Sequence, residues 1–212
     1  MDEASTAKTS RRTRVRRFAD RELEREDWLA VARRTLIEEG ISAVRIERLA
    51  KSLGVTRGGF YWRFRNLEEL HAALLEDWRA SNSRSLFEVL AKSNNLSDRF
   101  DDVARIWLEE KGYSPAWDTA MREWGRVSSH VAAAVHAVDA ERIAVLQRMF
   151  TDDGLQANAA LVRARILYFH QMGYYALDIH ENRKRRHDLM PIYKAALTGL
   201  DPSGLLDHQS DH

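Results

Sequence analysis

The sequence contains no cysteine, which excludes disulfide bridges, thiolate metal sites and cysteine nucleophiles. Only three prolines and ten glycines occur in 212 residues, so few positions interrupt regular backbone structure. No apolar run approaches the roughly 18 residues that a membrane-spanning helix needs. The first residues are charged and lack the apolar stretch of a secretory signal. We therefore expect a protein that has no membrane partner and is cytoplasmic.

Net charge is also small, but the charges are unevenly distributed. The formal net charge is +1, yet residues 11–17 read RRTRVRR, and acidic residues elsewhere balance them. A basic block on a nearly neutral chain indicates either a local contact with a polyanion or a solvated tail. The block alone favours neither interpretation.

Apolar residues recur at spacings of three and four, and no alternating strand pattern is present. This periodicity predicts an all-α protein. The helices expected from the apolar stripes and the glycines and cap residues between them cover residues 25–39, 46–53, 56–64, 67–92, 98–111, 115–130, 131–150, 156–181 and 184–199.

Residues 41–70 carry the most informative pattern. Two short helices are expected on either side of a tight LGVT turn, in which Gly54 supplies unusual backbone angles. The small Ala50 lets these helices approach closely. The apolar residues that can seal a small core around them are Val55, Phe60 and Phe64. Short helices crossed at a steep angle around a glycine-containing turn form a helix-turn-helix.

The helix after this turn carries side chains suited to the DNA major groove. Arg57 can recognise O6 and N7 of guanine, and Thr56 is expected to cap the helix with its hydroxyl. Gly58 and Gly59 each cost roughly 1 kcal/mol in a helix relative to alanine, which close approach to DNA would explain. Arg63 adds a fixed positive charge for phosphate contact.

The aromatic residues of this helix have two interpretations, which are core packing and DNA contact. Helical geometry favours the core for Phe60 and Phe64, whereas it directs Tyr61 and Trp62 away from that core. We expect the Tyr61 hydroxyl to bind phosphate and Trp62 to contribute to sequence contact.

The segment from Trp28 to Leu75 resembles the DNA-binding domain of the TetR family of repressors. The resemblance rests on the run IERLAKSLGVTRGGFYWRFRNLEELHAALL. It implies a homodimer on a pseudo-palindromic DNA operator and a C-terminal domain that binds a small-molecule effector. The positions that match family DNA contacts are Arg45, Thr56, Arg57, Gly58, Tyr61, Trp62 and Arg63.

Two departures from the family pattern matter. Arg45 stands where many members have a hydroxyl residue, and Leu67 stands where many have a lysine that contacts phosphate. Arg65 and Asn66 are candidates to offset the missing lysine. The basic block at residues 11–17 is a candidate to reach an adjacent minor groove.

The resemblance divides the chain into four regions. They are a basic arm at residues 1–22, a helix-turn-helix domain at 23–72, a helical effector-binding and dimerisation domain at 73–205, and a polar tail at 206–212.

The C-terminal half is rich in aromatic residues, which together favour a pocket between helices, although helical core and dimer interface explain any single one of them better. The candidate effector-lining residues are Trp107, Trp117, Met121, Trp124, Phe169 and Met172. The helices at 156–181 and 184–199 are the expected dimer elements, with a stripe formed by Val162, Ile166, Phe169, Gly173 and Ala176.

Enzymatic motifs are absent from the sequence. It has no glycine-rich phosphate loop, no GxSxG element and no carboxylate–histidine cluster at metal-ligand spacing. We expect no catalysis, no cofactor and no metal. The favoured function is a DNA-binding repressor released by a small, largely apolar ligand. The alternatives are a ligand sensor without specific DNA binding and a DNA-binding activator without an effector.

Overall fold

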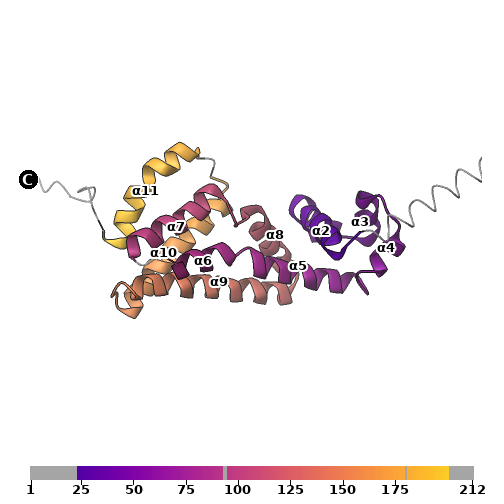
Figure 1. Cartoon of the computed structure of the whole chain (residues 1–212), viewed down its shortest axis with the longest axis horizontal. Coiled ribbons are helices and arrows are strands. Elements are labelled where there is room, and N and C mark those ends of the chain that lie inside the picture. The colour runs from indigo at the N-terminus through magenta and orange to yellow at the C-terminus, as the bar shows by residue number, and fades with distance from the viewer. Residues whose placement is uncertain (1–22, 93–94, 180, 201–212) are drawn as a thin grey trace, which may run out of the picture. The chain divides into compact units, whose positions relative to one another are not determined.

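The structure is a computed structural model that describes residues 23–92, 95–179 and 181–200. Within these ranges every regular element is helical and no strand occurs (Figure 1). The α-helices are α2 (Arg25–Glu39), α3 (Ile46–Leu53), α4 (Arg57–Tyr61), α5 (Leu67–Ser81), α6 (Arg84–Lys92), α7 (Leu96–Glu109), α8 (Pro115–Val127), α9 (Ser129–Thr151), α10 (Ala157–Ala176) and α11 (Arg183–Thr198), with a short 3₁₀ helix η1 (Ile41–Ala43). The predicted all-α class is confirmed.

Several helices end earlier than the sequence predicted, among them the helix expected over residues 156–181, which ends at Ala176. The continuous helix expected over residues 67–92 is wrong, because α5 ends at Ser81 and α6 begins at Arg84. Between them the Asn82 side chain accepts from the Ser114 backbone N–H (2.8 Å) and donates to Asp118 (3.2 Å). Such tertiary hydrogen bonds compete with the helical pattern. The helix expected to reach Phe64 ends at Tyr61.

The described residues form two compact units. One comprises residues 23–78 and 120–131, and the other comprises residues 79–92, 95–119, 132–179 and 181–200. The segment 120–131 thus groups with the N-terminal unit, whereas sequence reasoning assigned it to the C-terminal domain.

The N-terminal unit is built around a small aromatic core. Trp28 of α2 packs edge-on against Phe60 of α4, with ring centroids 5.3 Å apart, and Phe60 stacks on Phe64 at 5.4 Å. All three side chains are buried, as are Leu49 of α3 and Leu70 of α5. Edge-on and offset aromatic pairs are favourable beyond the area they bury. This core therefore holds α4 against α2.

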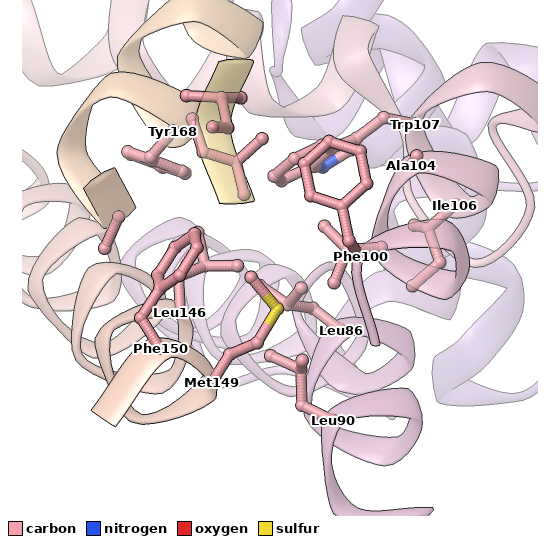
Figure 2. Packing of buried hydrophobic residues seen from close by; sticks show 14 of the residues in the cluster. Leu86, Leu90, Phe100, Ala104, Ile106, Trp107, Leu146, Met149, Phe150 and Tyr168 are labelled. Atoms are coloured by element: carbon pink, nitrogen blue, oxygen red, sulfur yellow. The ribbon is translucent and has the colours of Figure 1, made fainter. Parts of the chain in front are cut away.

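The C-terminal unit has a larger apolar core, to which α6, α7, α9 and α10 contribute (Figure 2). Phe100 and Trp107 of α7 lie on one side of the cluster in this view, and Leu146 and Phe150 of α9 lie on the other. All four side chains are buried. Their burial positions the polar network described next.

Arg142 of α9 is a charged residue inside this unit, with only 2% of its surface exposed. Its Nε donates to the Ser83 hydroxyl (2.9 Å), and one terminal nitrogen donates to Asp118 (2.9 Å). The guanidinium also donates to the Tyr168 hydroxyl and to the Asn82 carbonyl, each at 3.3 Å. Burial disfavours the charged guanidinium, but Asp118, Tyr168 and Tyr113 together outweigh this effect and raise the pKa of Arg142. The cation is thus fully paired and remains charged.

We predict that Arg142→Met strongly destabilises the C-terminal unit. Removing one partner of a buried ion pair leaves the other charge uncompensated, which costs about 3–5 kcal/mol. Urea unfolding followed by circular dichroism measures the change. Arg148→Met, at an exposed position on the same helix, is the control and should shift the free energy of unfolding by less than about 0.5 kcal/mol. Equal midpoints for the two variants would contradict the prediction.

Candidate nucleic-acid interface

The turn between α3 and α4 has the backbone geometry that the sequence predicted. Gly54 adopts the left-handed conformation (φ 71°, ψ 19°), and the Val55 N–H reaches back to the Ala50 carbonyl at 3.0 Å. Residues with a Cβ adopt this conformation only at a cost, which explains the glycine. Thr56 is then extended (φ −88°, ψ 160°). The turn therefore redirects the chain within three residues.

Helix α4 has two contrasting faces. Phe60 is fully buried, whereas Tyr61 and Trp62 expose 53% and 63% of their surfaces. Arg57 and Gly58 are exposed as well. Residues one turn apart share a face of a helix, so the buried Phe60 fixes which side chains point outward. A face with a basic, a small and two aromatic residues is thereby presented opposite the core.

Two expectations about the start of α4 need revision. Thr56 occupies the N-cap position, but its side chain does not accept the capping hydrogen bond that was expected. Gly58 has a local role, because a Cβ there would lie 3.3 Å from the Thr56 hydroxyl oxygen. Gly59 is buried. The first glycine thus leaves room for the Thr56 side chain, and the second lies toward the core.

Arg57 is paired with an acidic residue that sequence reasoning missed. Its guanidinium lies 3.2 Å from the Glu47 carboxylate on α3, and both side chains are about 60% exposed (61% and 62%). An exposed pair of this kind contributes little to stability, but it restricts the orientation of Arg57. The position of Glu47 in the first turn of α3 was the sequence feature that could have indicated this pair.

Arg63 points toward α2. Its Nε donates to the Leu23 carbonyl (2.7 Å), and its Nη2 lies 3.3 Å from Glu24, leaving the side chain only 20% exposed. In return, Arg25 donates to the Arg63 carbonyl (2.8 Å). Arg63, which was predicted to contact phosphate, therefore links the segment after α4 to the residues just before α2.

The other basic candidates remain at the surface. Arg45 is exposed, and its Nε donates to the Ser42 carbonyl (2.8 Å). Arg65 is 89% exposed and pairs with Glu69 at 3.0 Å. The backbone and side chain of Arg65 lower the pKa of Glu69 to about 2, with help from Arg25. Asn66 caps α5, as expected, by accepting from the Glu69 N–H (2.9 Å).

Comparison with known proteins supports the helix-turn-helix assignment. The sequence model of the family described as "Bacterial regulatory proteins, tetR family" matches residues 29–74. The chain is therefore similar to TetR-family regulators over this segment. It is 37% identical over 59 residues to the transcriptional regulator AcrR of Shigella flexneri, a stretch that covers 28% of this chain and 26% of AcrR. It is 31% identical over 90 residues to the probable regulator ArpR of Pseudomonas putida, covering 42% of this chain and 40% of ArpR.

Each of these matches therefore spans less than half of the curated relative. Solved structures extend the likeness to the whole fold. A TetR-family regulator from Streptomyces coelicolor superimposes with a TM-score of 0.69 at 18% identity, covering 82% of this chain and 94% of that one. Reduced NemR of E. coli gives a TM-score of 0.64 at 21% identity, covering 84% and 99%. These likenesses confirm the predicted fold, an N-terminal helix-turn-helix domain followed by a helical domain. TetR-family regulators are non-enzymatic, which agrees with the expectation of no catalysis.

The six candidate effector-lining residues are divided between the two units. Met121 and Trp124 lie in the N-terminal unit, while the other four lie in the C-terminal unit. Trp107 and Trp117 are buried and Met172 is partly buried, whereas Phe169 is 57% exposed on α10. Of the six, Trp107 alone lines the pocket that α7, α10 and α11 form.

Within the described ranges, no group of three histidine or acidic side chains is arranged to hold a metal ion. None of the helices described there is long and apolar enough to span a membrane.

We predict that Arg63→Ala lowers the stability of the N-terminal unit. Hydrogen bonds from a charged group are worth about 1.5–3 kcal/mol, and partial exposure places this one at the lower end. Thermal unfolding measures the change. Arg65→Ala, whose side chain is far more exposed, is the matched control and should have a smaller effect. If the two variants melt alike, the anchoring role of Arg63 is wrong.

Proposed function

We propose that this protein is a sequence-specific DNA-binding transcriptional regulator, a homodimeric repressor released from its operator by a small ligand. The proposal rests on the contrast between the two faces of α4. Phe60 is buried on one face, while Arg57, Tyr61 and Trp62 are exposed on the other. Large exposed aromatic side chains beside an arginine are costly to leave in water unless a partner covers them.

DNA contacts are divided among the exposed residues by their chemistry. Arg57 reads guanine through its two parallel N–H groups, and Glu47 limits the orientations available to it. Trp62 packs on the groove wall, and Tyr61 donates its hydroxyl to a phosphate. Arg45 and Arg65 supply exposed positive charge near this face. Arg63 supports the contact by positioning α4.

The basic arm at residues 1–22 lies outside the described residues. Its run RRTRVRR holds five arginines within residues 11–17. We propose that the arm adds phosphate or minor-groove contacts, which would make binding depend strongly on salt concentration.

The proposed homodimer rests on an apolar stripe along α10. Val162, Ile166 and Phe169 are 54%, 51% and 57% exposed and follow one another at helical spacing. Gly173 and Ala176 continue the stripe with small residues that allow close approach of a second helix. An exposed apolar stripe of this kind is typical of a face that another helix covers. A four-helix interface formed by α10 and α11 of two copies would bury it.

We predict that Arg57→Ala weakens operator binding by about 1–3 kcal/mol and relaxes preference at one base pair. Tyr61→Phe should instead weaken binding to all sequences alike, since it removes a phosphate contact. The operator is first selected from random duplexes by the full-length protein, and fluorescence anisotropy then measures its single-base variants. Arg34→Ala, on the exposed face of α2, is the control. If no specific, salt-sensitive binding occurs with any duplex, the sensor alternative is favoured.

We predict that Ile166→Asp converts the dimer to a monomer. A buried carboxylate without a partner costs several kcal/mol, so the substitution should prevent the two copies from associating. Size-exclusion chromatography with light scattering measures the mass. Val127→Asp introduces the same charge at another exposed apolar residue, 76% exposed and outside α10, and should leave the mass unchanged. A dimer that survives Ile166→Asp would place the interface elsewhere.

A further inference from the structure

A pocket opens in the C-terminal unit between α7, α10 and α11. About 500 Å³ of space, part of it open solvent, lies between its lining residues. Phe100, Ala104 and Leu108 of α7 form one wall, and Leu167 and Leu197 close the floor. Figure 2 shows Phe100, Ala104 and Trp107 together on this part of α7. The base of the pocket is therefore apolar.

Aromatic rings and polar groups surround the mouth. The His170 ring lies 4.6 Å from that of Tyr193 and 5.9 Å from that of Tyr174, measured between centroids. Burial and the nearby charge of Arg186 lower the pKa of His170, so its imidazole is neutral at pH 7. Flat, uncharged walls of this type favour a planar ring between them.

Gln171 places an unsatisfied donor in this lining. Its side chain is 6% exposed, and its contact with the Tyr175 hydroxyl leaves Nε2 without a well-formed hydrogen bond among the described residues. The neighbouring Tyr175 hydroxyl donates to the Trp107 carbonyl (3.3 Å). A buried N–H group without a partner costs about 1–3 kcal/mol, so it calls for an acceptor that is missing from the free protein.

Arg186 supplies positive charge at the same mouth. Its guanidinium lies 4.9 Å from the Tyr174 ring centroid, donates to the Trp107 carbonyl at 3.5 Å and also bonds to the Tyr175 hydroxyl. The only carboxylate in the lining, Glu181, accepts from the Tyr174 hydroxyl and lies 3.9 Å from Arg185. A guanidinium has five N–H donors, so these contacts leave Arg186 donors for an anion.

We infer that this pocket binds a small aromatic carboxylate, with its ring between Trp107, Tyr174 and Tyr193 and its carboxylate on Arg186 and Gln171. The inference names the effector class within the proposed function and rests on that function for its regulatory meaning. The enclosed part of the pocket is small, so admitting the ring requires the Tyr174 and Arg186 side chains to move outward. The fit requires an ionised acid, since a neutral amide offers Arg186 no charge.

Calorimetric titration of the full-length protein with benzoate, and with benzamide as the neutral counterpart, tests the site. Benzoate should bind more tightly than benzamide. Arg186→Gln should weaken benzoate binding by at least about tenfold, because a charge-assisted hydrogen bond is lost, and leave benzamide unchanged. Arg183→Gln, an exposed arginine on the same helix, is the control and should change neither. Absence of benzoate binding, or equal affinity in the Arg186→Gln and unmodified proteins, overturns the inference.

Gln171→Leu separates a ligand role from a structural one. Replacing an unsatisfied buried amide by an apolar group of similar size should raise the melting temperature of the free protein while weakening benzoate binding. A purely structural glutamine would give a lower melting temperature, which would overturn its assigned role. These measurements contain no DNA. A failure to bind benzoate is therefore distinguishable from a failure to bind DNA, which the operator-binding assay reports.

Discussion

The C-terminal unit depends on one constraint, which is that a guanidinium buried in its core must have a partner for its charge. Arg142 meets this requirement with Ser83, Asp118 and Tyr168, which come from three separate segments of the chain. Tyr168 in turn donates to Asp139 at 2.6 Å. Asp139 lies on α9, the helix that also carries Arg142. The break between α5 and α6 follows from this network, because Asn82 bonds to the same aspartate that pairs with the arginine. The apolar side chains in Figure 2 then fill the space around it.

In the N-terminal unit a similar dependence falls on Phe60, which packs against Trp28 and Phe64 at once. Burial of this one ring fixes the rotation of a helix only five residues long. Arg63 completes the attachment by bonding to the backbone of Leu23. The proposed reading face is therefore a consequence of core packing. The residues proposed to touch DNA are those that the core leaves outside.

Aromatic residues of the C-terminal half show how far residue type can predict a role. Trp107 lies in the lining of a pocket, Trp117 lies in the interior, and Phe169 lies on an exposed stripe. All three have the same local signal, a large apolar side chain at helical spacing, because core, pocket and interface select for the same surface chemistry. Gln171, which carries the donor of the inferred site, gave no signal in the sequence, since an isolated glutamine within a helix is ordinary. Its significance comes from its burial.

The sequence by itself determined the features that arise from neighbouring residues. Apolar periodicity established the helices, Gly54 established the left-handed turn, and Asn66 established the cap of α5, because each depends on backbone geometry within a few residues. Tertiary structure alone decided where distant polar groups meet. Asn82, Asp118 and Arg142 are separated by at least 24 residues, and their pairing ended a helix that local propensity would have continued. It likewise turned Arg63 toward α2, since a local pattern records that an arginine is available but not which partner lies within its reach.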